Sequence, residues 1–132
     1  MPTRGLLDTS VFIARESGRP LDSSAIPDET YVCVVTIAEL RAGVLAAPDT
    51  STRARRLATL EALSAVEPLP IDAAAAHEWA RLRVRLAEEG RRAPVSDLWI
   101  AAVAAANDLA VVTQDDDYDS VEQVGGPVVI RV

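Results

Sequence analysis

Four short segments of this chain are apolar at almost every position, and segments with helical patterns separate them. The apolar segments are residues 5–8, 31–35, 109–112 and 128–130. A strand with apolar side chains on both faces must be covered on both faces, which is typical of a parallel sheet between helices. The sequence therefore predicts an α/β fold of three layers, with a parallel β-sheet that has helices on both faces.

The segments between these strands carry apolar residues at helical spacing. We expect Thr9 or Ser10 to cap the first helix, Thr36 to open the second, and a third helix to cover residues 51–65. In the fourth helix an i, i+4, i+7, i+11 stripe is formed by Ala75, Trp79, Leu82 and Leu86. A fifth helix, over residues 96–106, is so uniformly apolar that we expect it to be buried on most sides.

The length and composition fit one globular domain over residues 1–132. The chain has 132 residues, of which 49% are hydrophobic, enough to bury a core of its own. It has no run of about 18 apolar residues and no secretory signal pattern, so we expect a cytoplasmic protein without membrane insertion. Cys33 is the only cysteine, which excludes an internal disulfide and a Cys-rich zinc site, and we expect it in the core.

The charge is negative overall and unevenly distributed. A net charge of -7 argues against indiscriminate binding to nucleic acid, which relies on a broad positive field. Residues 50–95 carry eight Arg against six acidic residues, whereas residues 96–132 carry one Arg against seven acidic residues. Every basic residue is Arg and none is Lys. This distribution is consistent with an acidic centre beside an Arg-bearing flank.

Acidic residues occur where the predicted strands end or the following helices begin. They are Asp8, Glu39, Asp97, Asp115 and Asp117. In open parallel sheets the carboxyl ends of the strands form the ligand-binding edge, so we expect these side chains to converge there. Two like charges 4 Å apart cost roughly 4 kcal/mol at an effective dielectric constant near 20, and a bound cation relieves that cost. Ligation by oxygen alone favours Mg²⁺ or Mn²⁺ over Zn²⁺.

Each of these acidic residues also has a structural explanation. Asp8 is placed to cap a helix, and Thr36 with Glu39 forms a capping-box pattern. Asp97 lies in the first turn of its helix, where the helix dipole favours an anion. Residues 115–119 are consistent with a solvated acidic loop. The whole set nevertheless favours a functional site, because independent helix caps need not fall on one edge of one sheet.

Taken in order, these residues form a pattern that resembles the PIN-domain nucleases, and especially the VapC toxins of VapBC toxin–antitoxin pairs. The matching segments are residues 7–11 (LDTSV), 36–40 (TIAEL), 96–102 (SDLWIAA) and 112–115 (VTQD), together with Tyr118. They span almost the whole chain. The resemblance implies a parallel sheet with helices on both faces, which agrees with the fold predicted from the apolar segments.

The resemblance also implies a Mg²⁺-dependent endoribonuclease that hydrolyses RNA phosphodiesters with a metal-activated water. The three best-defined acidic residues of the family correspond to Asp8, Glu39 and Asp97. The fourth corresponds to Asp115, although Asp117 is a further candidate. We expect Asp8, Asp97 and Asp115 to be metal ligands, with Asp117 as a possible additional ligand, and Glu39 to act through water.

Other residues are implied in supporting roles. Ser10 and Thr113 are candidates for orienting the carboxylates, although a structural role in a helix cap or a turn explains both residues equally well. The candidates for contacting the RNA backbone are Arg53, Arg55, Arg56, Arg91 and Arg92. A solvated helix face explains these arginines equally well. The implied partners are a VapB-type antitoxin, which would block the acidic pocket, the RNA substrate, and a second copy of the chain in a homodimer.

Several other functional classes are excluded or disfavoured. Receiver domains and haloacid-dehalogenase-like phosphatases need a Lys near the phosphate, and this chain has no Lys. A P-loop or dinucleotide fold needs a glycine-rich turn after its first strand, and no such turn follows residues 5–8. His77, the only histidine, has no motif spacing that would support catalysis. The remaining alternative is a catalytically inactive PIN-like module that acts with an antitoxin in repression of its own operon.

Overall fold

The computed structural model describes residues 2–132, which form four strands, six α-helices and one short 3₁₀-helix. The strands are β1 (Arg4–Leu7), β2 (Glu29–Tyr31), β3 (Ala110–Thr113) and β4 (Val129–Arg131). The α-helices are α1 (Thr9–Ser17), α2 (Val34–Leu45), α3 (Thr50–Glu61), α4 (Ala73–Glu88), α5 (Val95–Ala106) and α6 (Asp119–Gln123). The 3₁₀-helix covers Ser23–Ala25. None of the helices in this part of the chain has the length and apolar character needed to cross a membrane.

The four strands form one sheet in the order β2-β1-β3-β4, and every neighbouring pair is parallel. The register places Leu6 opposite Val111 and Leu7 opposite Val112. Because successive side chains of a strand point to opposite faces, these two cross-strand pairs face opposite sides of the sheet. The parallel sheet confirms the α/β fold that the continuously apolar strands predict.

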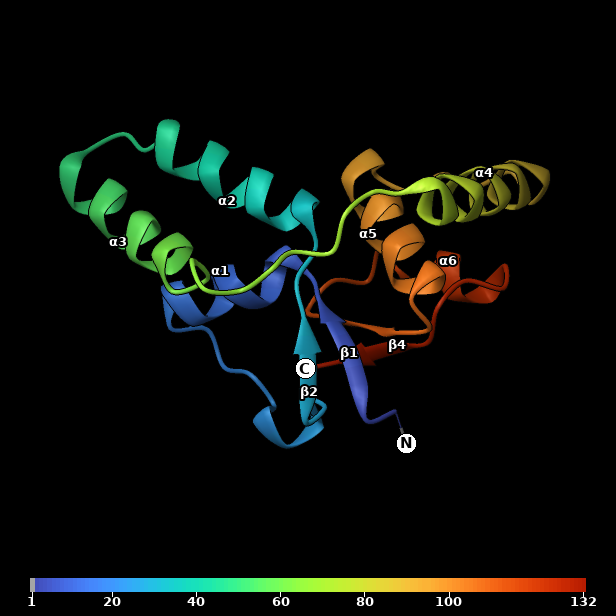
Figure 1. Ribbon diagram of the computed structural model, residues 1–132, viewed down its shortest axis with the longest axis horizontal. Helices are drawn as coiled ribbons and strands as arrows, with labels where there is room; N and C mark the ends of the chain where they lie inside the picture. Colours follow the sequence, from blue (N-terminus) through green and yellow to red (C-terminus); the bar gives the residue numbers. More distant parts are fainter. Residues whose placement is uncertain (1) are drawn as a thin grey trace.

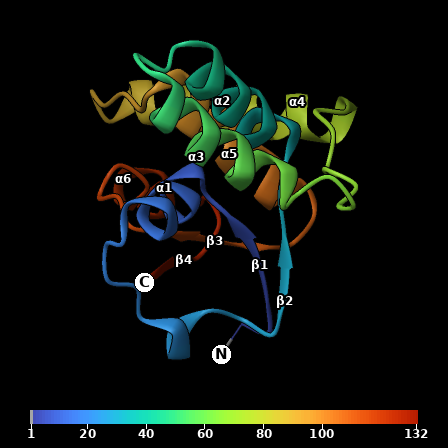
Figure 2. The same ribbon diagram turned by 90° about the vertical axis from the view of Figure 1, so that its left-hand side faces the viewer.

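Helices cover both faces of the sheet, and each face has its own core. Leu6 and Val111 pack in a cluster with residues of α4, α5 and α6, whereas Leu7 and Val112 pack with residues of α1, α2 and α3. Figures 1 and 2 show the two groups of helices on either side of the strands. The three layers are therefore those expected from sequence, and α5, buried at six of its positions, is the central helix of its layer.

Two helical hairpins extend past the carboxyl ends of the strands. Helices α2 and α3 pack against one another, and so do α4 and α5. In Figure 1 the two hairpins lie on either side of the point where β1 ends. The carboxyl end of β1 therefore lies between the two hairpins.

Gly5 allows the central strands to approach closely. A Cβ atom at this position would lie 2.6 Å from Cγ2 of Val112 and 3.1 Å from Cγ of Pro27. Any side chain here would therefore force Val112 or Pro27 to shift, next to the end of the strand that Asp8 follows.

The second predicted strand is wrong in its extent. The apolar run over residues 31–35 is shared between a strand and a helix, because β2 ends at Tyr31 and Cys33 is the N-cap of α2. Only an isolated bridge between Cys33 and Leu69 extends the sheet beyond Tyr31. Helix α2 therefore begins two residues before Thr36, because a buried helix turn accepts the same apolar side chains as a buried strand.

Two helix boundaries and one additional helix also differ from expectation. Asp8, and neither Thr9 nor Ser10, is the N-cap of α1. Helix α3 ends at Glu61, although the helix was expected to continue to residue 65, and a turn follows it there. Helix α6, which has only five residues, follows the acidic run and was not expected, because its length is too short to show a periodic pattern.

Candidate active site

Asp8 lies at the end of β1 and is held through both of its carboxylate oxygens. Oδ2 accepts hydrogen bonds from the hydroxyl of Thr113 at 2.9 Å and from the backbone N–H of Ser10 at 3.3 Å. Oδ1 accepts a hydrogen bond of 2.7 Å from the hydroxyl of Tyr118. The side chain is buried, with 2% of its surface exposed. Asp8 is thus a helix cap, as its position suggested, and at the same time a fixed carboxylate in a buried polar network.

Tyr118 is a residue of this network to which the sequence analysis assigned no role. Its side chain is fully buried in the core cluster that includes α5 and α6. Burial raises the pKa of Tyr118, and the nearby charge of Asp8 raises it further, so its hydroxyl remains a hydrogen-bond donor. Tyr118 is among the residues that carry the family resemblance, but its contact with Asp8 was not predicted.

Glu39 faces the same edge from the second turn of α2. The hydroxyl of Thr9 donates a hydrogen bond of 2.7 Å to Oε1 of Glu39 and lies 3.0 Å from the hydroxyl of Thr36. The capping-box interpretation is wrong, because the backbone N–H of Thr36 donates to the carbonyl of Cys33 and Thr36 lies within the helix. Glu39 is therefore fixed by a hydroxyl from α1 and has no role in capping its own helix.

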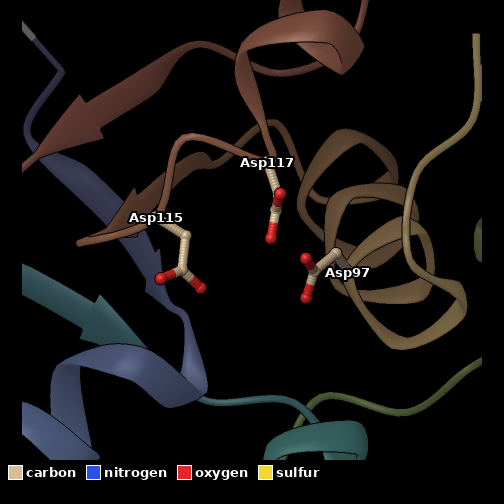
Figure 3. Close-up of side chains that lie close together, drawn as sticks. All are labelled: Asp97, Asp115 and Asp117. Atoms are coloured by element: carbon tan, nitrogen blue, oxygen red, sulfur yellow. The ribbon is translucent and has the colours of Figure 1, made fainter.

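Three further carboxylates converge on one point. Asp97 lies in the first turn of α5, and Asp115 and Asp117 lie in the loop between β3 and α6. Each offers a carboxylate oxygen such that the three atoms lie within 4.8 Å of one another. Figure 3 shows the three side chains pointing towards a common centre from two different elements. Of the predicted acidic residues, these three have carboxylate oxygens that lie close enough together to bind one cation.

The electrostatics of the cluster disfavour full ionisation in the absence of a cation. Desolvation, followed by the charges of Asp8, Asp117, Asp115 and Glu39, raises the pKa of Asp97 to about 7. Desolvation, followed by the charges of Asp8 and Asp117, also raises the pKa of Asp115. A divalent cation would stabilise the ionised forms, and because every donor is a carboxylate oxygen the group suits a hard ion such as Mg²⁺ or Mn²⁺.

Four of the predicted acidic residues line one cavity of about 210 Å³. The lining consists of Asp8, Thr9, Ser10, Ile13, Arg19, Glu39, Asp97 and Asp115. We call this space the acidic cavity. Arg19 is its one basic lining residue, and the sequence analysis did not single it out, because it lies in a loop with no motif around it.

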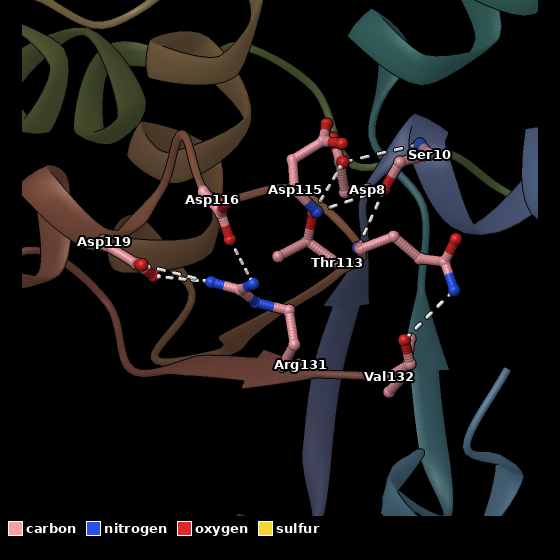
Figure 4. A network of polar contacts seen from close by, with 9 residues as sticks. Asp8, Ser10, Thr113, Asp115, Asp116, Asp119, Arg131 and Val132 are labelled. Carbon is pink, nitrogen blue, oxygen red and sulfur yellow. Dashed lines mark hydrogen bonds and ion pairs between the residues drawn. The ribbon is translucent and has the colours of Figure 1, made fainter.

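Ser10 and Thr113 connect α1 to the end of β3 and support the acidic cavity. Their hydroxyl oxygens lie 3.2 Å apart, and the backbone N–H of Gln114 donates to Oγ of Ser10 at 3.0 Å. Oγ1 of Thr113 also accepts a hydrogen bond of 2.9 Å from the backbone N–H of Asp115. Figure 4 shows this network around Asp8. The hydroxyl of Thr113 therefore contacts the carboxylate of Asp8 directly, whereas Ser10 reaches it only through its backbone N–H and its hydroxyl contacts Thr113 and Gln114.

The loop that carries Asp115 and Asp117 is held from its outer side by Arg131 of β4. The Arg131 guanidinium forms ion pairs with Asp116 and Asp119 (Figure 4). The acidic run thus divides into two carboxylates that join the cluster with Asp97 and two that pair with Arg131. Asp116 and Asp117 are the exposed members of the run, so the interpretation as a solvated acidic loop fits only part of it.

The five arginines predicted to contact RNA do not line the acidic cavity. Arg55 and Arg56 line a neighbouring cavity of about 320 Å³ beside α2, which shares Ile13 and Glu39 with the acidic cavity. Arg91 and Arg92 line another cavity at the start of α5. Arg53 is exposed on α3. These side chains lie on the two helical hairpins, one group on each side of the carboxyl edge.

Cys33 and His77 both lie away from the acidic cavity. Cys33 is fully buried, and desolvation raises the pKa of its thiol, which confirms a core position. His77 is exposed on α4 and does not line the acidic cavity.

Comparisons with known proteins identify the family to which the chain belongs. The PIN domain family model matches residues 5–124. The chain is 58% identical over 131 residues to ribonuclease VapC5 of Mycobacterium tuberculosis, covering 99% of this chain and 97% of the relative. It is 44% identical over 121 residues to ribonuclease VapC4 of the same organism, with 92% and 93% coverage.

Solved structures give the same result. The crystal structure of VapBC-5, a toxin–antitoxin system of Mycobacterium tuberculosis, matches with a TM-score of 0.92 at 55% identity and covers 99% of this chain and 100% of the matched chain. A DNA-bound VapBC from Salmonella typhimurium matches with a TM-score of 0.75 at 26% identity, with 98% and 97% coverage. The chain therefore belongs to the PIN-domain family and, within it, to the VapC group.

Proposed function

We propose that this protein is a Mg²⁺-dependent endoribonuclease and the toxin of a VapBC toxin–antitoxin pair. The observation that carries the proposal is the convergence of Asp8, Glu39, Asp97 and Asp115 on the acidic cavity, with Asp117 beside them. Two relatives that align with more than nine-tenths of the chain are named as ribonucleases. The chemistry of the cavity and the names of the relatives thus favour the same activity.

Asp97, Asp115 and Asp117 are the proposed metal ligands, and Asp8 is a further one. Oδ1 of Asp8 accepts a single hydrogen bond, from Tyr118, so it retains a lone pair that a cation can use. When bound, Mg²⁺ or Mn²⁺ would polarise a phosphoryl oxygen of the substrate and lower the pKa of a nearby water. The carboxylates would fix the ion at the end of β1, where the substrate reaches the cavity between the two hairpins.

Glu39 is proposed to position the attacking water and accept its proton. Thr9 holds Oε1 by a hydrogen bond of 2.7 Å, which leaves Oε2 available to a water in the acidic cavity. Ser10 and Thr113 are proposed to support catalysis indirectly, because they keep the ends of β1 and β3 together. The proposed substrate is an exposed single-stranded loop of RNA, because protein side chains reach unpaired nucleotides more readily than those inside an A-form helix.

A VapB-type antitoxin and a second copy of this chain are the proposed partners. The VapBC-5 structure that matches this chain is described as a toxin–antitoxin system. A cavity of about 320 Å³ adjoins the acidic cavity, because Ile13 and Glu39 line both. An antitoxin segment seated there would cover the acidic cavity. Light scattering of the purified chain, alone and with its antitoxin, tests both assemblies.

A catalytically inactive binding module is the competing proposal. A module that only binds an antitoxin does not need carboxylates from α5 and from the loop after β3 that converge within 4.8 Å of one another, as those of Asp97, Asp115 and Asp117 do. Such a cluster is costly in the absence of a cation, which favours the nuclease over the inactive module.

The activity is tested by incubating the purified, antitoxin-free protein with total cellular RNA, with Mg²⁺ or Mn²⁺ and with EDTA. We expect discrete cuts that require the metal, and mapping their ends by sequencing would identify the target. A folded protein that cuts nothing under either metal would favour the binding module.

A further inference from the structure

Arg19 brings a positive charge to a cavity that is otherwise lined by carboxylates. It follows the C-terminus of α1 and lines the acidic cavity with Asp8, Glu39, Asp97 and Asp115. Arg19 is therefore close enough to influence the charge of any group bound in the cavity.

The backbone of Arg19 is fixed on both sides. Gly18 adopts a left-handed conformation with φ of 73°, which ends α1 and allows the N–H of Arg19 to donate to the carbonyl of Ala14 at 2.8 Å. On the other side, the side-chain amide of Gln114 donates to the carbonyls of Pro20 at 2.9 Å and of Val132 at 3.0 Å. The start of the Arg19 side chain is thus held at the edge of the acidic cavity.

The guanidinium itself has no partner among the described residues. Arg131 pairs with Asp116 and Asp119, and Arg81 pairs with Glu78, but no ion pair or side-chain hydrogen bond involves Arg19 within residues 2–132. A structural counter-ion would close onto one of the four nearby carboxylates. Arg19 instead remains exposed and available to a ligand.

We propose that Arg19 binds a phosphate group of the RNA at the acidic cavity and so acts as a substrate-binding residue. The inference rests on the proposed function, because it takes RNA as the ligand. A guanidinium matches two phosphate oxygens at once, and it stabilises negative charge that develops on them. Apart from the proposed metal ion, Arg19 is the one positive charge that lines the acidic cavity, whose other charged lining residues are carboxylates.

The proposal is tested with Arg19→Gln and Arg19→Lys, and with Arg15→Gln as the matched control. Arg15 is also an exposed arginine at the end of α1, but it does not line the acidic cavity. Three quantities are measured for each variant: kcat/KM on a labelled single-stranded RNA that contains a mapped cleavage site, the Kd for that RNA in EDTA at several salt concentrations, and the Kd for Mn²⁺ without RNA.

We expect Arg19→Gln to lower kcat/KM by roughly 10- to 100-fold and to reduce the salt dependence of RNA binding by about one charge. Arg19→Lys should recover part of the loss, because it keeps the charge without the bidentate geometry. Arg15→Gln should change both quantities by less than about twofold. The affinity for Mn²⁺ should stay the same or increase in Arg19→Gln, because a repelling charge is removed.

Each contrary result has a different meaning. If Arg19→Gln matches Arg15→Gln in RNA binding and cleavage while the wild-type protein cuts RNA, the inference about Arg19 is wrong and the proposed function stands. If Arg19→Gln loses Mn²⁺ affinity, Arg19 supports the metal site and is not a substrate contact. If the wild-type protein binds Mn²⁺ but neither binds nor cuts RNA, both proposals are wrong.

Discussion

The hydroxyl of Tyr118 donates a hydrogen bond of 2.7 Å to Oδ1 of Asp8 beneath the acidic cavity. Tyr118 has no exposed surface, and Asp8 has 2% of its surface exposed. The contact joins the end of the first strand to the segment that precedes α6, 110 residues later. It fixes the orientation of the carboxylate and connects the two parts of the chain that supply Asp8 and Asp115.

Tyr118→Phe should reduce both stability and activity. The substitution keeps the ring but leaves Oδ1 of Asp8 without its buried donor, which costs about 1–3 kcal/mol. Urea unfolding should show that loss, and kcat/KM for RNA should fall by roughly tenfold. Tyr31→Phe is the matched control, because the hydroxyl of Tyr31 donates to Glu29 at the surface. Equal effects of the two substitutions would show that the contact with Asp8 has no special role.

Thr9→Val should reduce cleavage without affecting metal binding. Val has nearly the shape of Thr but removes the hydroxyl that holds Oε1 of Glu39 at 2.7 Å. A less well fixed carboxylate should lower kcat/KM by roughly 5- to 20-fold. Calorimetry should give an unchanged Kd for Mn²⁺, because Thr9 contacts no proposed ligand. Thr59→Val, which removes a hydroxyl from α3, serves as the control. A wild-type rate for Thr9→Val would contradict the assigned role of Glu39.

The sequence predicted the layers and the approximate elements because the burial of a parallel strand requires apolar residues on both of its faces. It misplaced the boundary near Cys33, because a run of buried apolar residues satisfies a strand and a helix turn equally well. It also missed α6, whose five residues are too few to show a period. Such boundaries depend on tertiary contacts, in this case the bridge from Cys33 to Leu69.

The acidic residues of the site were predicted together because strand ends share one edge of a parallel sheet. The contacts that fix them were not predictable in the same way. Tyr118 reaches Asp8 across 110 residues, and Arg19 lies in a loop whose position depends on a side chain of Gln114. The division of the acidic run between the cluster and Arg131 likewise follows from the position of β4, which no local pattern encodes.

The metal-free protein should become less stable as the pH rises from about 4 to 7. The pKa of Asp97 is raised from 3.8 to about 7 in the folded state, so the folded state binds more protons than the unfolded state between these values. The free energy of unfolding therefore decreases with increasing pH in this window. Urea unfolding in EDTA should show a weaker pH dependence for Asp97→Asn than for the wild-type protein, and saturating Mn²⁺ should offset the loss. Identical pH profiles would contradict the raised pKa.

Arg131→Gln should weaken metal binding with little effect on global stability. Arg131 and its two partners are at the surface, where ion pairs contribute about 0–1 kcal/mol. Releasing Asp116 and Asp119 should nevertheless let the loop with Asp115 and Asp117 move, and the Kd for Mn²⁺ should rise by roughly 3- to 10-fold. Arg4→Gln, which breaks a surface pair with Glu29, is the control. If both variants bind Mn²⁺ equally well, Arg131 does not position the loop.

The most direct test of the account is a titration of the purified protein with Mn²⁺, followed by calorimetry or by the electron paramagnetic resonance signal of the free ion. Asp97→Asn should weaken binding by at least about tenfold. Asp108→Asn is the control, because it removes the same charge just before β3, at the end of the strand opposite to Asp115. Asp108 has a left-handed backbone conformation, which Asn tolerates. This variant should bind Mn²⁺ as the wild-type protein does. Equal binding by all three proteins, or no binding by the wild type, would contradict the assignment of Asp97, Asp115 and Asp117 as a cation site.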